Sequence, residues 1–372
     1  MSRRALVLIL ATLSLVAVAV VSYARALRTE LDDAGGYALT LMELRQSALK
    51  DYLETIRSEL ILWTDRPALR DALVELKRGW DRLPGDRTEL LQRLYIDESP
   101  YPEGEKHRLA AAGDGSLYSQ VHNAVHPRAL RFLEEHEYHE VFLFDTDGNL
   151  IYTVYKEPDF ATNLSDGPWR ETGLGRAFRA ARDAKTEESV AFTDFEGYEP
   201  SENEPASFMA SPVWSNDGAP IGVMAVQIPV GRINEIMRFT GGMGETGETY
   251  IVGEDLLMRS DSRFSDTTTI LRTGVHSETV RRALAGETGV EIAEDYRGAP
   301  VLSAFGPLDF EGVRWAVMAE IDEQEVRKLA LEPRRLLANV FFGLAAIAAL
   351  AALLYTYLAS RAERPEPWTT ET

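Results

Sequence analysis

A chain of 372 residues has room for two or three modest domains, and 45% hydrophobic residues allow sizeable cores. Its formal net charge of −20 excludes a nucleic-acid groove, which needs a basic stripe, and disfavours anionic partners in general. Cysteine is absent, so disulfide bonds and thiol catalysis are excluded.

The chain begins and ends with long apolar segments. Ala5 to Tyr23 carries no charged residue, and Leu336 to Leu358 is likewise uncharged. Each segment reaches the roughly 20 residues that a helix needs to cross a bilayer. We therefore predict an N-terminal transmembrane anchor over residues 1–26, a C-terminal transmembrane helix over 333–359 and a short cytoplasmic tail over 360–372.

The charges beside these segments predict their orientation. Arginines precede the first segment and follow the second, at Arg3, Arg4, Arg361 and Arg364. Because cytoplasmic flanks are enriched in Lys and Arg, both ends are expected in the cytoplasm and the main body outside it. Ala24-Arg25-Ala26 leaves a second interpretation open, a cleaved signal peptide, which would also place the body outside the cytoplasm.

Residues 27–127 form a predicted stalk and helical region. Apolar residues recur every three or four positions from Leu27 to Trp63, through Leu44 and Ala48, which predicts one long helix. Shorter helices are predicted over 68–80, 88–95 and 116–135, with a loop rich in Pro and Gly over 99–115. Part of the long apolar stripe is expected to pack on its own chain and part on a second copy, in a homodimer.

From Glu140 the pattern changes from helices to strands. EVFLF and NLIYTVY flank a DTDG turn and form a predicted hairpin, followed by a helix over 169–184 and a strand over 189–195. ASFMASPVW and APIGVMAVQIPV flank an SNDG turn, the strongest short-range hairpin signal, and lead into a helix in GRINEIM.

A similar order returns after Glu245. ETYIVGEDLLMRSD parallels EVFLFDTDGNLIYT, SETVRRALAG parallels LGRAFRAARD, and APVLSAFGPL and VRWAVMAEI form a further hairpin. The order strand–strand–helix–strand–strand–strand–helix is thus expected twice. This predicts an α+β fold of two tandem modules, each an antiparallel sheet flanked by helices, over residues 128–241 and 242–332.

These segments resemble the double Cache family of bacterial extracytoplasmic sensors, found in chemoreceptors, sensor kinases and cyclases. The resemblance covers about Ala26 to Leu331 and rests on the repeat order and on FLFDTDGNLIYTVYKEPDFATNL, VMAVQIPVGRINEIM and GETGETYIVGEDLLMRSDSRF. It implies a long N-terminal helix beside two PAS-like modules, here called the distal module (128–241) and the proximal module (242–332). It also implies transmembrane helices on both sides and a periplasmic body at the bacterial inner membrane.

One difference from the resembled family concerns the output. Its members continue into HAMP, kinase, cyclase or chemotaxis modules, whereas only Ser360 to Thr372 follow the second membrane helix here. The output is therefore expected from a separate signalling or transport partner.

Three patterns that could carry chemistry have simpler explanations. Gly242 to Gly247 matches G-x-G-x-x-G, but it follows a helix and opens a strand, whereas a dinucleotide loop does the reverse. Asp145 begins DTDGN, but an EF-hand needs its glycine at position six, so we expect a hairpin turn. His122 and His126 have the i, i+4 spacing of a metal pair, although exposed helical histidines are commoner. We predict no metal, no cofactor and no catalytic residue.

A small-molecule site is predicted in the distal module from the period of two in its strands. In GVMAVQIP, Met224 and Val226 would pack against the stalk helix, while Gln227 lies on the other, concave face beside small residues. The other residues expected around the ligand come from neighbouring strands and from the loop above: Tyr152, Lys156, Phe160, Trp169, Arg170, Asp194, Ser207, Met209 and Ser211. Aromatic walls with a few convergent polar groups are typical of ligand pockets. The alternative, that Tyr152 and Trp169 are ordinary core aromatics, stays open.

The charges in this set bear on the ligand. Lys156 and Arg170 favour a carboxylate or a similar anion. In the amino-acid-binding subgroup of the resembled family, an aspartate near the end of this strand holds the ligand's ammonium group, and Gln227 stands about there. The subgroup's Arg-x-Trp pattern is also absent, since Gly167 precedes Pro168 and Trp169. An amide cannot offset a buried ammonium as a carboxylate does, so we predict that ordinary α-amino acids are not the ligand.

The leading hypothesis is a membrane-anchored sensor that binds a small organic, anionic ligand in its distal module and signals through its transmembrane helices to a separate partner. The alternative is an adaptor whose Cache-like body binds another extracytoplasmic protein and no small molecule.

Overall fold

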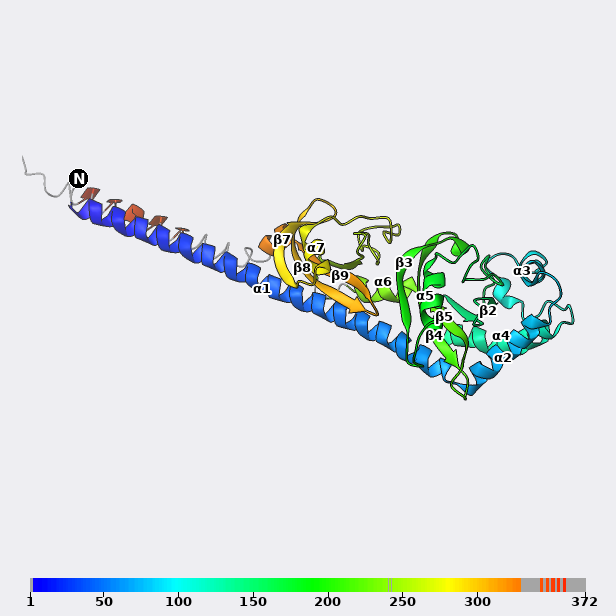
Figure 1. Ribbon diagram of the computed structural model, residues 1–372. Coiled ribbons are helices and arrows are strands. Elements are labelled where there is room, and N and C mark those ends of the chain that lie inside the picture. Colours follow the sequence, from blue (N-terminus) through cyan, green and yellow to red (C-terminus); the bar gives the residue numbers. More distant parts are fainter. Residues whose placement is uncertain are drawn as a thin grey trace, which may run out of the picture.

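The computed structural model describes residues 3–239, 241 and 243–328 and, further along the chain, 342–343, 346–347, 349–351, 353–354 and 357–358. One helix, α1 (Arg3–Thr64), runs alongside both modules and extends past them at its N-terminal end (Figure 1). The proximal module packs on the middle of α1, and the distal module lies at its C-terminal end (Figure 1). The predicted long helix is confirmed.

Short helices surround the C-terminal end of α1. They are α2 (Pro67–Asp81), α3 (Arg87–Gln92), a π turn (Arg93–Asp97), a 3-10 turn (Lys106–Arg108) and α4 (Leu117–His136). Their starts are specified locally: Pro67 takes the first position of α2, and the side chains of Asp86 and Ser116 accept backbone N–H groups at 3.1 Å. The three predicted helices are therefore present, within a few residues of their expected bounds.

The distal module is one antiparallel sheet with a helix on the face opposite α1. Its strands are β1 (Glu140–Phe144), β2 (Leu150–Thr153), β3 (Ala191–Tyr198), β4 (Glu204–Trp214) and β5 (Pro220–Gln227), in the order β2-β1-β5-β4-β3. Helix α5 (Gly173–Arg182) covers β3, β4 and β5, a 3-10 turn (Glu199–Ser201) precedes β4, and α6 (Val230–Arg238) leaves towards the next module. Both predicted hairpins, with their Asp-Gly turns, are present.

The proximal module repeats this plan with one strand fewer. It contains β6 (Glu248–Val252), α7 (Glu278–Leu284), β7 (Gly289–Glu294), β8 (Pro300–Phe310) and β9 (Val313–Asp322), in the sheet order β6-β9-β8-β7. The expected second strand in DLLMRSD is wrong. That segment makes only isolated bridges, because Leu256 adopts a left-handed φ of 65° and Arg259 turns towards the distal module.

The predicted stripe on α1 is buried for the most part. Its members Ala38, Leu41, Ile56 and Leu60 are at most 6% exposed, and Met42, Leu49 and Leu53 beside them are fully buried against the modules. Leu44 is 56% exposed, so the periodicity predicts the helix and most of its buried face, while the sheets leave Leu44 uncovered. Met42 shows how closely the helix approaches: a Cβ on Gly306 of β8 would lie 2.9 Å from its methyl group.

Most side chains of the predicted membrane segments lie outside the described residues. Within the part of the chain that the structure describes, no helix is long and apolar enough to cross a bilayer. Most side chains of the predicted anchor (1–26), most of the predicted helix 333–359 and all of the tail 360–372 lie outside the described residues. The two anchors remain predictions.

Candidate functional site

The two faces of the distal sheet are covered by different elements. On one face, here called the stalk face, β-strand side chains join a hydrophobic cluster with α1, α2 and α4: Val141, Leu143, Met209, Met224 and Val226. On the other, here called the α5 face, they pack with Leu174 and Phe178 of α5: Phe142, Phe144, Phe208, Val223 and Ala225. The strand period of two thus places Met224 and Val226 towards the stalk and Gln227 on the α5 face.

Several residues predicted around the ligand lie on the stalk face instead. Tyr152, Phe160 and Met209 are fully buried in the stalk-face cluster. Ser207 and Ser211 alternate with Phe208 and Ala210, which belong to the α5 face, so they point the same way as Met209. The expectation of one pocket holding all of these residues together with Gln227 is wrong, because the sheet itself separates them.

Lys156 is also on the stalk side, in a buried polar cluster. Its ammonium group donates to the carbonyl of Val154 at 2.9 Å, and burial lowers its pKa to about 7. His126 lies in the same cluster: its Nε2–H donates to the carbonyl of His107, so its Nδ1 accepts from the Tyr152 hydroxyl at 2.8 Å. Burial, together with Lys156, lowers the pKa of His126 to about 4. Lys156 is therefore a structural group here and not an anion-binding cation on the α5 face.

Arg170 and Asp194 are engaged elsewhere. The Arg170 side chain is 53% exposed and pairs with Glu171 at 2.8 Å. Asp194 joins the modules: its carboxylate accepts two bonds from Arg259 of the proximal module, at 2.8 and 2.9 Å, and one from the indole N–H of Trp315 at 2.7 Å. Asp194 Oδ1 also accepts from the backbone N–H group of Phe195 at 2.7 Å. The ligand role expected for Asp194 is replaced by the link to Arg259 and Trp315 of the proximal module.

A group of buried polar side chains remains on the α5 side. Gln227 is 4% exposed and its Oε1 has no hydrogen-bond partner. Asp159 is fully buried; its Oδ2 accepts from the Tyr198 hydroxyl at 2.6 Å, while its Oδ1 has no partner. The ring of Tyr198 packs on Phe208 at 4.9 Å, and Phe208 is the strand partner of Gln227. Trp169 packs against the same cluster with its indole N–H unpartnered.

Burial of unpaired acceptors is unfavourable unless something else satisfies them. The unpartnered oxygens of Asp159 and Gln227 are both acceptors. Burial raises the pKa of Asp159 to about 6, although its bond from Tyr198 lowers it. The site can therefore receive a hydrogen-bond donor, and a cationic donor would be held most strongly by ionised Asp159.

Two further acids lie close to this group. Glu140, the strand partner of Gln227, accepts backbone N–H groups of Val141, Val154 and Tyr155 at 2.6 to 2.8 Å. Burial still raises the pKa of Glu140 to about 8. Glu157 accepts from Ser201 at 2.6 Å, and burial raises its pKa to about 7. These acids add acceptors to the group around Asp159 and Gln227.

The proximal module carries acids in the same row of its sheet. Glu248 and Glu320 are strand partners, as Glu140 and Gln227 are in the distal module. Glu320 is 1% exposed and accepts from the hydroxyls of Tyr250 and Ser303 at 2.8 and 2.7 Å. Burial raises its pKa to about 7. Every carboxylate oxygen of this pair already has a hydroxyl partner, which distinguishes it from Asp159.

Sequence reasoning missed Asp159, Tyr198 and Glu140. Asp159 lies in the loop between β2 and α5, where a polar residue is expected whatever its role. One signal was available for Glu140: as the first residue of a strand in which every other residue is apolar, it is buried on a face that the period of two assigns to the core. Tyr198 had no signal, because only the fold brings it to Asp159.

The histidine pair of α4 is buried, not exposed as the simpler interpretation held. The rings of His122 and His126 stack with centroids 5.0 Å apart. Among the described residues, no group of three or more His, Cys, Asp or Glu side chains is arranged to hold a metal ion.

Residues 90–330 match the family model of the Cache domain. Solved structures with a similar chain path include the ligand-binding domain of the Pseudomonas fluorescens chemoreceptor CtaA in complex with L-serine (13% identity, covering 79% of this chain and 99% of that chain, TM-score 0.43). Others are the sensor domain of the V. cholerae histidine kinase DctB (12%, 77% and 97%, TM-score 0.45) and the sensory domain of the Campylobacter jejuni chemoreceptor Tlp3 (12%, 82% and 99%, TM-score 0.47). No curated protein matches.

Cache domains are non-catalytic modules that bind ligands outside the cell, which agrees with the prediction that the chain is not an enzyme. The long helix and the two antiparallel sheets are those expected of the double form. Because the family match covers more than half of the residues, the chain belongs to the Cache domain family, as a double Cache extracytoplasmic sensor module.

Proposed function

We propose that the protein is a membrane-anchored sensor whose distal module binds a small organic molecule on the α5 face. The observation that carries the proposal is the pair of buried oxygens without a partner, on Asp159 and Gln227. A ligand that presents an amine to these oxygens would complete their hydrogen bonds and neutralise Asp159. The acceptor-rich surroundings, Glu140 and Glu157 included, support the same charge.

The anionic ligand expected from Lys156 and Arg170 is not carried into this proposal. Lys156 lies on the stalk side and Arg170 is exposed and paired, so neither offers a cation to the α5 face. The prediction that ordinary α-amino acids are not the ligand is kept. Asp159 now supplies a carboxylate for an ammonium group, so the prediction rests instead on the carboxylate group of an α-amino acid, for which neither Lys156 nor Arg170 is available on the α5 face.

Signalling is proposed to follow the contacts that leave the distal module. One route is the Asp194–Arg259 pair between the modules, and another is the packing of β4 and β5 on α1. A ligand can shift such a system only if it binds two arrangements with different affinity. The receiver is proposed to be a separate partner or a second copy of the chain, and exposed Tyr37 and Leu44 on α1 (43% and 56%) favour a helix-to-helix homodimer.

Thermal-shift measurements on the purified full chain test the ligand proposal. Primary amines that carry no carboxylate group should raise the melting temperature, since a ligand at 100 times its Kd stabilises by about 2.7 kcal/mol. The shift should vanish in Asp159→Asn and persist in Arg170→Ala. Stabilisation by dicarboxylates that is lost in Arg170→Ala would show the proposal to be wrong and restore the anionic ligand. Crosslinking to one extracytoplasmic protein with no response to either class would favour the adaptor.

A further inference from the structure

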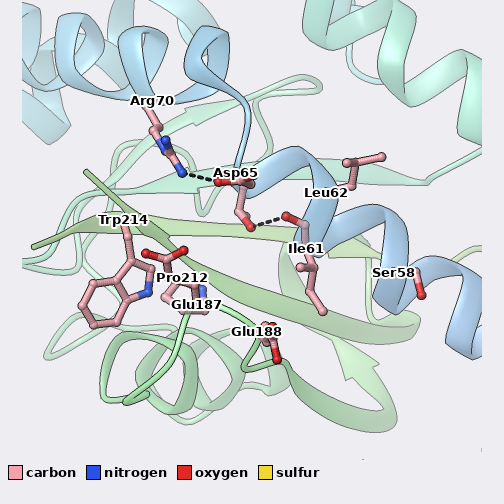
Figure 2. Close-up of a pocket in the computed structure, with 10 residues that line it drawn as sticks. Ser58, Ile61, Leu62, Asp65, Arg70, Glu187, Glu188, Pro212 and Trp214 are labelled. Carbon is pink, nitrogen blue, oxygen red and sulfur yellow. Dashed lines mark hydrogen bonds and ion pairs between the residues drawn. The ribbon is translucent and has the colours of Figure 1, made fainter. Parts of the chain in front are cut away.

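A pocket lies away from the α5 face, where α1 ends and α2 begins (Figure 2). Its volume is about 400 Å³, and α1, α2, the loop before β3 and the end of β4 contribute to its lining. None of the residues in the proposed ligand site lines it. What this pocket binds is therefore a separate question from the ligand of the α5 face.

Two hydrogen-bond donors at this pocket have no acceptor. The Nε of Arg70 and the indole Nε1 of Trp214 are both buried and unpartnered. The other nitrogens of Arg70 are occupied: Nη1 donates to Asn216 at 2.8 Å and Nη2 pairs with Asp65 (Figure 2). The guanidinium group is thus fixed in place, with Nε as the nitrogen that has no acceptor, and a ligand oxygen would satisfy its N–H group.

Although two hydrogen-bond donors lie at the pocket, most of the charged residues that line it are acidic. Three carboxylates, on Asp65, Glu187 and Glu188, line the pocket with the single guanidinium of Arg70. Asp65 is taken by Arg70, whereas Glu187 and Glu188 form no ion pair with any residue that the structure describes. Their loop is held near α1, since the carbonyl of Glu188 accepts from Arg57 at 3.4 Å.

The rest of the lining is apolar apart from the hydroxyl groups of Ser58 and Thr64. Ile61 and Leu62 of α1 face the pocket from one side and Pro212 and Trp214 of β4 from the other, with Leu62 57% exposed. In Figure 2 the indole of Trp214 lies beside Glu187 and Pro212. An indole face next to a carboxylate is a favourable environment for an organic cation.

We propose that this pocket binds a small organic cation that also carries a hydrogen-bond acceptor. The cationic end, an ammonium or guanidinium group, lies against Glu187 and Glu188. The acceptor, a carboxylate or amide oxygen, receives the N–H groups of Arg70 and Trp214, and a short apolar chain between the two ends packs on Ile61 and Leu62. Such a ligand contacts α1, α2 and β4 together and so fastens the stalk to the distal sheet.

Isothermal titration of the purified full chain tests the inference with three matched probes. 4-Guanidinobutyrate carries both groups, butylguanidine lacks the acceptor, and butyrate lacks the cation. We expect 4-guanidinobutyrate to bind most tightly and butyrate not at all. Glu187→Gln combined with Glu188→Gln should weaken 4-guanidinobutyrate by about tenfold or more, because charged hydrogen bonds are lost, while Glu204→Gln, an exposed acid of β4 outside the pocket, changes nothing.

Trp214→Phe provides an independent test, since this variant keeps an aromatic ring and removes the N–H donor. It should weaken 4-guanidinobutyrate and leave butylguanidine unchanged. The inference is overturned if 4-guanidinobutyrate gives no binding heat at millimolar concentration, if butyrate binds as tightly, or if the double Glu variant binds like the wild type. Because Asp159 takes no part, Asp159→Asn should bind the probes normally, which separates this result from that of the proposed function.

Discussion

The ion pair between the modules allows a sharp test of how the fold is held together. Asp194→Ala removes the carboxylate that receives two bonds from Arg259 and one from the Trp315 indole. Arg259 is 3% exposed, so its charge would be left in the interface with only Asp255, at 2.9 Å, as an ionic partner. Neighbouring aromatic contacts, such as Phe192 on Trp315 at 5.8 Å, would remain.

The loss of unfolding free energy in Asp194→Ala can be estimated from the burial of the ion pair. Removing one partner of a fully buried ion pair costs about 3–5 kcal/mol. Asp194 is 26% exposed and Arg259 keeps Asp255, so we expect about 2–3 kcal/mol. The matched control is Glu311→Ala, which breaks a pair of similar length between the proximal module and Arg57 of α1, with both side chains about 30% exposed. Such a partly exposed pair contributes only about 0–1 kcal/mol.

Thermal unfolding of both variants is the assay. Asp194→Ala should lower the melting temperature by roughly 4–10 °C and Glu311→Ala by at most roughly 3 °C. Combining Asp194→Leu with Arg259→Met should recover part of the loss, because no unpaired charge stays buried. Equal effects of the two single variants would refute the reasoning from burial. Lost ligand binding at an unchanged melting temperature would instead restore the ligand role expected for Asp194.

Other variants test further parts of the fold. Burial raises the pKa of Glu320 to about 7, so the folded chain keeps a proton that the unfolded chain releases near pH 4.5. The stability that depends on this proton is therefore complete below about pH 4.5 and is lost as the pH rises through about 7. Denaturant unfolding at several pH values should therefore show wild type losing stability relative to Glu320→Gln across that window, and parallel curves would contradict it. Gly36→Ala in α1 should raise the free energy of unfolding by about 0.5–1 kcal/mol, because its Cβ meets nothing within 4 Å, whereas at Gly35 it would lie 3.2 Å from Val290 and gain less; equal melting temperatures would contradict this. Glu325→Ala removes the acceptor for the N–H groups of Glu245 and Thr246 at 2.9 and 2.8 Å, so amide exchange should accelerate over 243–247 and not in the distal sheet; unchanged exchange there would show that the contact is dispensable.

Local features of the fold could be predicted from the sequence because local residues determine them. The DTDG and SNDG turns need only their own residues to reverse the chain, and both hairpins are present. The stalk helix and most of its buried face follow from its apolar period. Leu44 is nevertheless exposed and Met42 buried, although both are apolar, because only the sheets decide which of them is covered. The prediction of a strand near Leu256 is wrong for the same reason, because a tertiary contact and not the local sequence determines the backbone there.

The candidate site was less predictable because its residues are brought together over long distances in the chain. Asp159 and Tyr198 are 39 positions apart, and Asp194 and Arg259 are 65 apart. Residue type suggested a binding role for Asp194, whereas the fold places it in the contact with Arg259; Asp159 carried no prediction, and the fold buries it against Tyr198. The period of two did place Gln227 on the correct side, because that inference needs only one strand.

The unbroken length of α1 has a mechanical consequence. A helix of 62 residues, at about 1.5 Å per residue, is a rod about 93 Å long. The distal module holds the C-terminal end of this helix and the proximal module its middle, so a tilt of α1 together with the proximal module by about 2° would move the N-terminal end sideways by about 3 Å. Sub-ångström adjustments beside β4 and β5 can therefore become displacements comparable to an atomic diameter far away, without melting a single turn.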